Sequence, residues 1–181
     1  MEASDGFLKA HSHNVSRLST RLARRLQLEE NDVDRIKTAA LLHDIGKLVI
    51  DGKILRKPTP LTPGEYDLIK KHPLYGVSLL SHTRVFDEEL PLILHHHERF
   101  DGEGYPHGLK GDDIPLGSRI ICITEAFDGL TAGAVYRAAI SAEKAIAELT
   151  RCSGTHFDPS LVNIMIGLIN HADETDQSLE A

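Results

Sequence analysis

Residues 41–47 read LLHDIGK, which places a histidine and an aspartate side by side at the end of an apolar run. Apolar residues recur at three- and four-residue steps from Val33 onward, so we expect an amphipathic helix that runs into His43 and Asp44 and stops at about Gly46. Burying an imidazole beside a carboxylate is costly without compensation. For an isolated His-Asp pair, an ion pair at a helix end is the more common explanation, and the rest of the chain must decide.

Helical periodicity continues along most of the chain, and no convincing strand alternation appears. Thr62 and Glu65 have the spacing of a capping box, with Pro63 suited to the first helical position. Prolines and glycines predict one loop over residues 51–63 and a long structured loop over 102–115. The sequence therefore predicts an all-α fold. Helices are expected at about residues 8–26, 32–44, 62–71, 74–81, 87–98, 116–130, 141–151 and 159–170.

Length and composition predict one compact domain. The chain has 181 residues with 41% hydrophobic content, enough to bury a good core. We expect the domain to cover residues 1–172 and a polar tail to occupy 173–181. Acidic residues outnumber basic ones by 27 to 20, and the formal charge of -7 argues against broad binding to a nucleic acid polymer or an anionic membrane. A small phosphate ligand held locally stays compatible with this charge.

Cysteine usage and hydropathy predict a cytoplasmic location. Cys122 and Cys152 form neither a Cys-x-x-Cys pair nor a dense disulfide pattern, which favours a reducing compartment. No window approaches the roughly 18 apolar residues of a membrane helix. The start lacks the charged-then-apolar order of a signal sequence, and it also suits a segment of a longer chain.

Eleven histidines are the unusual feature of the composition. Helical spacing turns His11 toward the interior, His72 precedes Pro73 at a helix junction, and residues 95–97 are three consecutive histidines. Taken singly, His72 could be a polar junction residue and the triple histidine a solvated patch. Together with nearby carboxylates they suggest a metal site, because nitrogen and carboxylate ligands suit Fe, Mn or Zn. The other histidines are expected at surface or packing positions.

Two further charged residues fit a metal site. Glu125 lies in the otherwise apolar stretch 120–127, where an unpaired carboxylate would be costly and a metal would neutralise it. Lys47 lies three residues after Asp44, one helical turn on, where its ammonium could meet a phosphate bound at the metal.

The order of several motifs resembles the HD-GYP domains, a branch of the HD superfamily of metal-dependent phosphohydrolases. The resemblance spans almost the whole chain and implies a compact helical bundle of about seven or eight helices with a long GYP loop, residues 102–115, which contains Gly104, Tyr105 and Pro106. The matching runs are LLHDIGK (41–47), KPTPLTPGE (57–65), KHPLYG (71–76), HHERFDGEGYP (96–106), GLKGDDIPL (108–116) and GTHFDP (154–159).

This resemblance implies a phosphodiesterase that hydrolyses the bacterial second messenger cyclic di-GMP to pGpG, GMP or both, with a bridging hydroxide on a two-metal site. Asp44 and Lys47 would be the catalytic residues, with Asp44 bridging two divalent transition-metal ions. Iron or manganese is expected, and nickel or zinc fits the same ligands. One metal would be held by His11, His43, Asp44 and Glu125, and the second by Asp44, His72, His96 and His97.

The resemblance also implies the surroundings of the metals. Lys47, Tyr105 and Arg137 are expected to contact the substrate, and Glu98 and Asp101 to orient ligand histidines through their second ring nitrogen. The alternatives are plain loop packing for Tyr105 and Arg137 and ordinary loop charges for Glu98 and Asp101. The GYP loop is expected to contact a signalling partner such as a diguanylate cyclase domain. A homodimer is left open.

Three departures from the family pattern leave a second class of function open. The family usually has aspartate where Glu125 stands and a glutamate at the place of Phe7. Where the family run resembles TSxRPYR, residues 131–137 read TAGAVYR, so Ala134 replaces an arginine. The alternatives are a weakly active or inactive signalling module that acts through protein partners, and a phosphohydrolase of another nucleotide. Replacing Glu125 with aspartate would discriminate between an enzyme and a non-catalytic module.

Overall fold

The computed structural model describes the backbone of residues 2–132 and 138–177 and the side chains of residues 9–132 and 138–170. Within these ranges the chain forms helices and no strand, apart from one isolated bridge between Ser153 and Phe157. The predicted all-α fold is confirmed. The elements are α1 (Glu2–Arg25), α2 (Glu30–Leu42), the 3-10 helix η1 (Ile45–Val49), α3 (Gly52–Leu55), α4 (Pro63–Ile69), α5 (His72–Ser81), α6 (Leu90–Leu94), the 3-10 helix η2 (Gly111–Asp113), α7 (Leu116–Thr131), α8 (Ala142–Arg151) and α9 (Pro159–Gln177).

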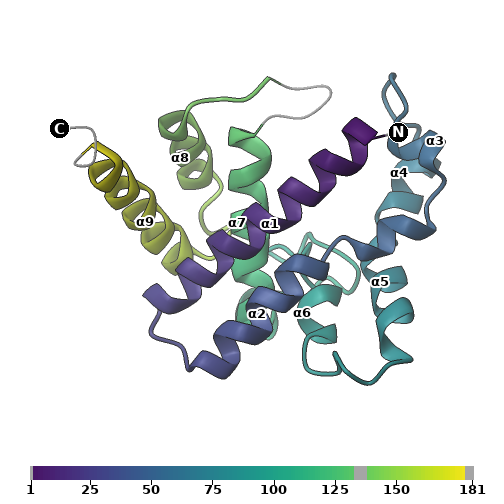
Figure 1. The fold of residues 1–181 in the computed structure, drawn as a ribbon, viewed down its shortest axis with the longest axis horizontal. Coiled ribbons are helices and arrows are strands. Elements are labelled where there is room, and N and C mark those ends of the chain that lie inside the picture. The colour runs from purple at the N-terminus through teal and green to yellow at the C-terminus, as the bar shows by residue number, and fades with distance from the viewer. Residues whose placement is uncertain (1, 133–137, 178–181) are drawn as a thin grey trace.

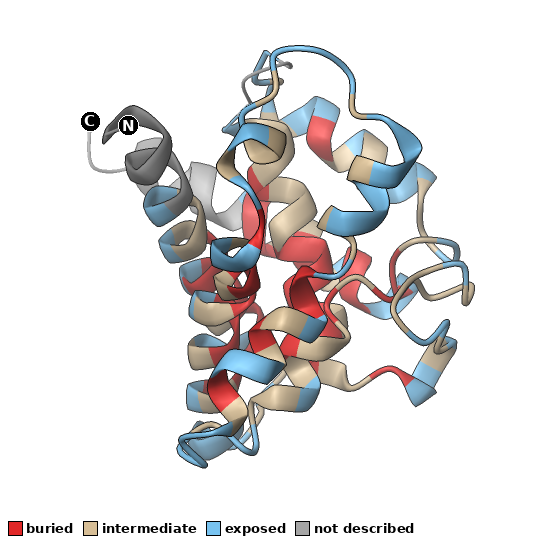
Figure 2. Cartoon of the chain, turned by 90° about the vertical axis from the view of Figure 1, so that its right-hand side faces the viewer, coloured by how far each residue is buried: buried red, intermediate tan, exposed pale blue. Residues whose placement is uncertain are grey.

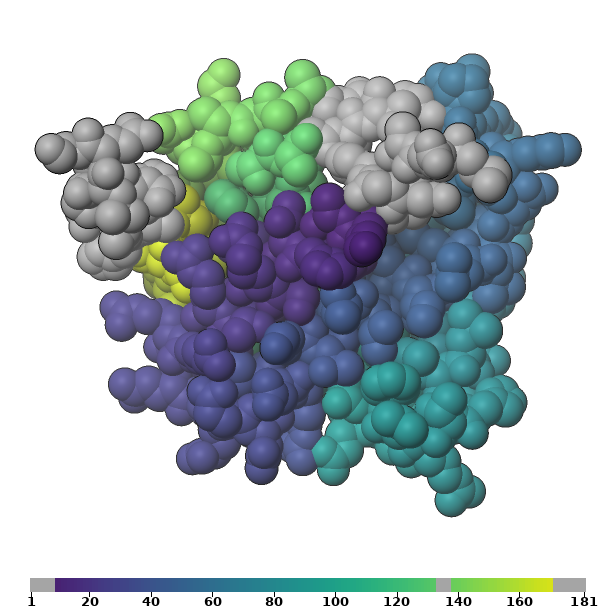
Figure 3. All heavy atoms as spheres, in the orientation of Figure 1, coloured from purple at the N-terminus to yellow at the C-terminus, as the bar shows by residue number. Residues whose placement is uncertain are grey.

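Helices α1, α2 and α7 form the centre of the bundle. Helix α1 packs along α2 and against α7, and α6 packs against α2, α5 and α7. Figure 1 shows α8 and α9 on one side of this centre and α3, α4 and α5 on the other. In the space-filling view, α1 and α2 cover the middle of one face (Figure 3). No helix among the described residues has the length and apolar character needed to cross a membrane.

Two apolar clusters make up the core. The first joins α1, α2, α7, α8 and α9 through buried residues such as Leu22, Ile120 and Met165. The second, which includes Val15 and Ile93, extends the core toward α5 and α6. Figure 2 shows the buried residues on the inward faces of the helices. Helices α2 and α6 both contribute to the second cluster. Its packing therefore fixes the ends of these two helices, which His43 and His96 directly follow.

Helix α4 and its cap follow the sequence prediction. The Thr62 hydroxyl accepts a hydrogen bond from the Glu65 backbone N–H at 3.3 Å, and the Glu65 carboxylate accepts one from the Thr62 backbone N–H at 2.7 Å. This reciprocal capping box satisfies two backbone donors at the helix start. Helix α5 begins at His72, two residues earlier than expected, with Pro73 in its first turn.

Other elements also differ from the predictions, and α1 begins at Glu2 instead of at about residue 8. The expected loop over residues 51–63 contains the single turn α3, because the Asp51 side chain accepts a hydrogen bond from the Lys53 backbone N–H at 2.8 Å. Helix α6 is shorter than the predicted residues 87–98. It ends at Leu94, where the His96 Nδ1 atom donates to the Ile93 carbonyl oxygen at 2.6 Å and so occupies an acceptor that a longer helix would use. Helix α9 continues beyond residue 170 to Gln177, where no proline or glycine interrupts it.

Gly46 allows η1 and α5 to approach closely. A Cβ atom added there would lie 1.9 Å from the His72 carbonyl oxygen and 2.5 Å from the Gly76 backbone nitrogen. Both are backbone atoms, which cannot turn aside as a flexible side chain can. Glycine is therefore required for the contact that brings the start of α5, and with it His72, beside Asp44.

Replacing Gly46 with alanine is expected to destabilise the fold. Overpacking against backbone should lower the free energy of unfolding by about 3 kcal/mol. Urea unfolding measures this change, and Gly64→Ala is the matched control because an added Cβ there meets no atom within 4 Å. The control should be neutral or slightly stabilising. Equal stabilities of the two variants would contradict the close approach of η1 and α5.

Candidate metal centre

Residues far apart in the sequence converge from six helical elements, most of them from helix ends and His11 and Glu125 from within a helix. His11 comes from α1, and His43 and Asp44 come from the segment joining α2 to η1. The core described above fixes the helices that carry these residues. The remaining predicted residues of this centre are Lys47 in η1, His72 at the start of α5, His96 and His97 directly after α6, and Glu125 on α7.

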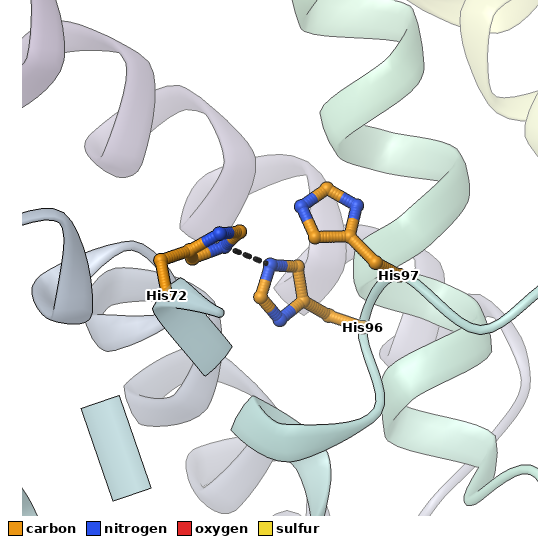
Figure 4. Close-up of side chains that lie close together, drawn as sticks. All are labelled: His72, His96 and His97. Atoms are coloured by element: carbon orange, nitrogen blue, oxygen red, sulfur yellow. Dashed lines mark hydrogen bonds between the residues drawn. The ribbon is translucent and has the colours of Figure 1, made fainter. Parts of the chain in front are cut away.

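The histidine rings form two adjacent groups. Ligand atoms of His72, His96 and His97 lie within 4.8 Å of one another, as do those of His11, His43 and Glu125. Figure 4 shows the first group, in which the rings of His72, His96 and His97 point toward one another. The Nε2 atoms of His72 and His96 are 3.1 Å apart. The two groups touch, since the His43 and His96 ring centroids are 5.1 Å apart.

Asp44 lies between the two histidine groups. Its Oδ1 atom is 3.3 Å from His72 Nε2, and its Oδ2 atom is 3.5 Å from His43 Nε2. Ligand atoms of Asp44, His96 and Glu125 also lie within 4.8 Å of one another. One carboxylate thus faces both histidine groups, which is the position that a bridging ligand needs.

Backbone carbonyls orient three of the rings. The Nδ1 atoms of His43, His72 and His96 each donate to the carbonyl oxygen three residues earlier. The acceptors are Ala40, Ile69 and Ile93, at 2.7, 2.9 and 2.6 Å. Such bonds leave the Nε2 lone pair of each ring for the centre, as is usual for metal-binding histidines. The same bonds occupy carbonyls at the ends of α2 and α6.

Two buried polar atoms show that the centre fits a cation. Among the described side chains, His43 Nε2 and Asp44 Oδ1 are buried without a hydrogen-bond partner. Leaving such atoms unpaired costs about 1–3 kcal/mol each. Both atoms face the space shared by the histidine groups, where a divalent metal would satisfy them. The donor set of imidazole nitrogens and carboxylate oxygens suits Fe, Mn, Ni or Zn.

The protonation states also suit metal binding. Burial alone would raise the pKa of Asp44, but His43, Lys47 and His72 hold it well below its ordinary value. Burial lowers the pKa of His72 to about 4 and that of His96 well below its usual range. At neutral pH Asp44 is therefore ionised, while His72 and His96 keep neutral rings with free lone pairs.

Glu125 reaches both groups from α7. Burial alone would raise the pKa of Glu125, but the neighbouring His97 and His43 lower it by a larger amount. The net shift of its pKa is therefore downward. Its Oε2 atom lies 3.9 Å from His97 Nδ1. The longer glutamate side chain thus places an ionised carboxylate at the junction of the two histidine groups.

Lys47 and Tyr105 border the centre. The Lys47 ammonium donates to Asp44 Oδ2 at 2.7 Å, and although burial opposes it, the charges of Asp44 and Glu125 raise the pKa of Lys47. Tyr105 stacks on His97 with ring centroids 4.8 Å apart, and burial raises the pKa of its phenol. At neutral pH the first is a cation and the second a neutral hydroxyl group.

Sequence reasoning missed Asp128 as part of the centre. Its Oδ2 atom lies 2.6 Å from His11 Nδ1, and the carboxylate is buried. Burial lowers the pKa of His11, but the hydrogen bond to Asp128 raises it above the ordinary value. This carboxylate fixes the His11 ring as carbonyls fix the rings of His43, His72 and His96. The available signal was the spacing, since Asp128 follows Glu125 by one helical turn.

Glu98 and Asp101 bind the GYP loop rather than a ligand ring. The Glu98 carboxylate accepts hydrogen bonds from the backbone N–H groups of His107 at 2.7 Å and Leu109 at 3.1 Å. Asp101 accepts a hydrogen bond from the Glu103 backbone N–H at 3.0 Å and pairs with Arg99 at 2.5 Å. The described contacts therefore give these two carboxylates a role in shaping the loop, which differs from the expected orientation of metal-binding histidines. Arg137 and Ala134 lie outside the described residues.

Two cavities open beside the centre. One, of about 390 Å³, is lined by Asp44 and by the basic residues Lys9, Lys47 and Arg56. The other, of about 370 Å³, is lined by His97 and Glu125 together with Cys122, Glu148 of α8 and Cys152. A ligand in the first would meet cationic side chains as it approaches Asp44.

Comparisons with known proteins identify the family of this chain. Residues 1–161 match the family described as HD domain. The chain is 39% identical over 176 residues to the 3'3'-cGAMP-specific phosphodiesterase 2 of Vibrio cholerae, covering 96% of this chain and 33% of that protein. It is 38% identical over 168 residues to the cyclic di-GMP phosphodiesterase response regulator RpfG of Xanthomonas campestris, covering 92% and 44%. The chain belongs to the HD-GYP branch of the HD-domain family.

Solved structures agree with the HD-GYP fold. A protein of Bdellovibrio bacteriovorus described as an HDG"Y"P protein superposes with a TM-score of 0.74 at 22% identity, over 90% of this chain and 52% of that one. A cyclic GMP-AMP specific phosphodiesterase of V. cholerae gives a TM-score of 0.69, also at 22% identity, over 88% and 44%. The HD-GYP domain described here spans less than half the length of the two curated relatives named above.

The metal-free HD-GYP domain is expected to lose stability as the pH falls from about 6.5 to 4. His72 has an unfolded pKa near 6.5 and a folded pKa of about 4, so the unfolded chain binds more protons in this window. At about 1.4 kcal/mol per pKa unit, His72 alone contributes roughly 3 kcal/mol to the decrease.

Urea unfolding of the metal-free protein at several pH values measures this decrease. His72→Gln should flatten the profile, whereas His82→Gln, at an exposed position, should leave it unchanged. An unfolding free energy that is constant from pH 6.5 to 4 would contradict the burial of neutral histidines.

Proposed function

We propose that this domain is a metal-dependent phosphodiesterase that hydrolyses cyclic di-GMP to pGpG, to GMP or to both. The observation that carries the proposal is the carboxylate of Asp44 facing two histidine groups whose rings are oriented for metal binding. The names of the relatives support the substrate class, since they describe phosphodiesterases of cyclic di-GMP and 3'3'-cGAMP.

The ligand assignment follows the two groups. We assign one metal to His11, His43, Asp44 and Glu125, and the second to Asp44, His72, His96 and His97. Iron or manganese is the expected pair, and nickel or zinc fits the same donors. When bound, two such ions would activate a water molecule as nucleophile and stabilise the charge that develops on the phosphoryl oxygens.

The chain's own residues complete the reaction. Lys47 would hold a non-bridging phosphoryl oxygen through its ammonium, which stays charged because Asp44 lies 2.7 Å away. Lys9 and Arg56 line the same cavity and would attract the second phosphate. Attack of water on phosphorus breaks the bond to the 3′-oxygen, which takes up a proton and leaves as a hydroxyl. The product therefore carries a 5′-phosphate, as pGpG does.

Tyr105 would contact the substrate from the GYP loop. Its ring packs on His97, and its neutral phenol can donate a hydrogen bond. Arg137 is retained as a substrate contact on the strength of the family resemblance. A signalling partner at the GYP loop, a homodimer and a cytoplasmic location remain predictions.

A turnover assay with purified protein tests the proposal. Cyclic di-GMP, 3'3'-cGAMP and cyclic di-AMP are each incubated with metal-loaded and metal-stripped protein, and the products are separated by chromatography. We expect metal-dependent conversion of cyclic di-GMP to a product with a 5′-phosphate. No hydrolysis of any of the three by the metal-loaded protein would contradict an enzymatic function.

A second candidate substrate is 3'3'-cGAMP. The relative at 39% identity is named as specific for this dinucleotide. The same substrate panel separates the two, because a turnover of 3'3'-cGAMP well above that of cyclic di-GMP would reassign the substrate and leave the metal chemistry unchanged.

A further inference from the structure

A second cluster of metal-ligand side chains lies at the base of the GYP loop. His95 Nε2 and His107 Nδ1 are 3.1 Å apart, and their ring centroids are 5.3 Å apart. A carboxylate oxygen of Glu98 lies within 4.8 Å of the ligand atoms of both histidines. His95 directly follows α6, and His107 follows Pro106 in the loop, so the cluster joins two separate segments of the chain.

The ring of His95 is oriented as a metal ligand. Its Nδ1 atom donates to the Pro91 carbonyl oxygen at 2.9 Å, which leaves the Nε2 lone pair directed toward His107. Two nitrogens bound to one tetrahedral zinc ion at about 2.0–2.1 Å lie roughly 3.3 Å apart. The observed separation of 3.1 Å is close to that value.

Glu98 supplies a fixed negative charge. Its carboxylate is buried and is held by the backbone N–H groups of His107 and Leu109. A carboxylate accepts about four hydrogen bonds or metal contacts, so two lone-pair positions remain for a cation. The hydrogen bond from the His107 backbone N–H also links the His107 backbone to Glu98, whose carboxylate would bind the same metal ion as the His107 ring.

We propose that His95, Glu98 and His107 form a separate loop metal site for zinc or a similar transition-metal ion. Two imidazole nitrogens and one carboxylate oxygen would bind the ion, with a fourth position open to water because His107 is exposed. The ion links the end of α6 to the GYP loop. It therefore restrains the loop that carries Tyr105 over His97.

Zinc stoichiometry tests the loop metal site. The full chain and the variants His107→Gln and His95→Gln are equilibrated with zinc buffered in the micromolar range, and bound zinc is counted by elemental analysis. Each variant should bind one zinc ion fewer than the unchanged protein. His82→Gln is the control, because His82 makes the same Nδ1 bond to a carbonyl, to Ser78 at 2.8 Å, and belongs to none of the described ligand clusters.

A zinc titration followed by imidazole NMR signals separates direct binding from an indirect effect. The signals of His95 and His107 should shift together as one equivalent of zinc binds in addition to any metal held by the centre around Asp44. The proposal is overturned by an equal zinc content in the unchanged protein and His107→Gln, or by an equal loss in His82→Gln. Since the readout is a difference of one ion, it holds whether or not the centre around Asp44 binds metal or hydrolyses a dinucleotide.

Discussion

Replacing Asp44 with asparagine is expected to abolish hydrolysis. Asparagine keeps the volume of the side chain but removes the charge that faces both histidine groups, so neither metal keeps its shared ligand. We expect turnover to fall on the order of 1,000-fold or more, which corresponds to about 4 kcal/mol of transition-state stabilisation. Bound metal should fall in parallel, as measured by elemental analysis.

Asp51→Asn provides the matched control for this variant. Asp51 is exposed and caps α3, and asparagine caps a helix start equally well. Its turnover should therefore match that of the unchanged protein. If Asp44→Asn retained both its metal and its turnover, Asp44 would not be the bridging ligand.

Replacing Glu125 with aspartate is expected to lower turnover about 10- to 100-fold, the scale on which misplaced metal ligands act. Glutamate reaches the junction of the histidine groups from α7, with Oε2 3.9 Å from His97 Nδ1. Removing one methylene withdraws the carboxylate toward the helix. Steady-state kinetics at saturating metal and at limiting metal would show whether the loss is one of metal affinity.

Glu143→Asp, at an exposed position on α8, is the control and should leave turnover unchanged. A rise in turnover for Glu125→Asp from a value near zero would contradict the enzymatic function. In that case the natural glutamate would mark a signalling module that acts through protein partners, with metal binding but little catalysis.

The sequence was sufficient to predict the fold class and most of the candidate centre. Helical spacing alone turned His11 inward, and the costly burial of His43, Asp44 and Glu125 pointed to a cation. The inward position of His11 could be predicted because helix periodicity is local, so one face of a helix can be followed along the chain. The division of the ligands between two metals came from the family resemblance and stays a prediction.

The features that sequence reasoning missed depend on contacts between distant residues. The Asp128 carboxylate meets His11 across 117 positions, and the pairing of His95 with His107 depends on the path of the GYP loop. The end of α6 was misplaced for a local reason, because the His96 side chain competes for the carbonyl of Ile93, three residues earlier. Propensity and spacing contain no information on such pairings.

An anomalous difference map from crystals of the metal-loaded protein, recorded at the absorption edge of the bound metal, is the most direct test of the two-metal centre. We predict two peaks flanking Asp44, each at about 2.0–2.2 Å from its carboxylate oxygens and from the ring nitrogens of its own histidine group. A map with no peak among His43, Asp44, His72 and His97 would contradict the account.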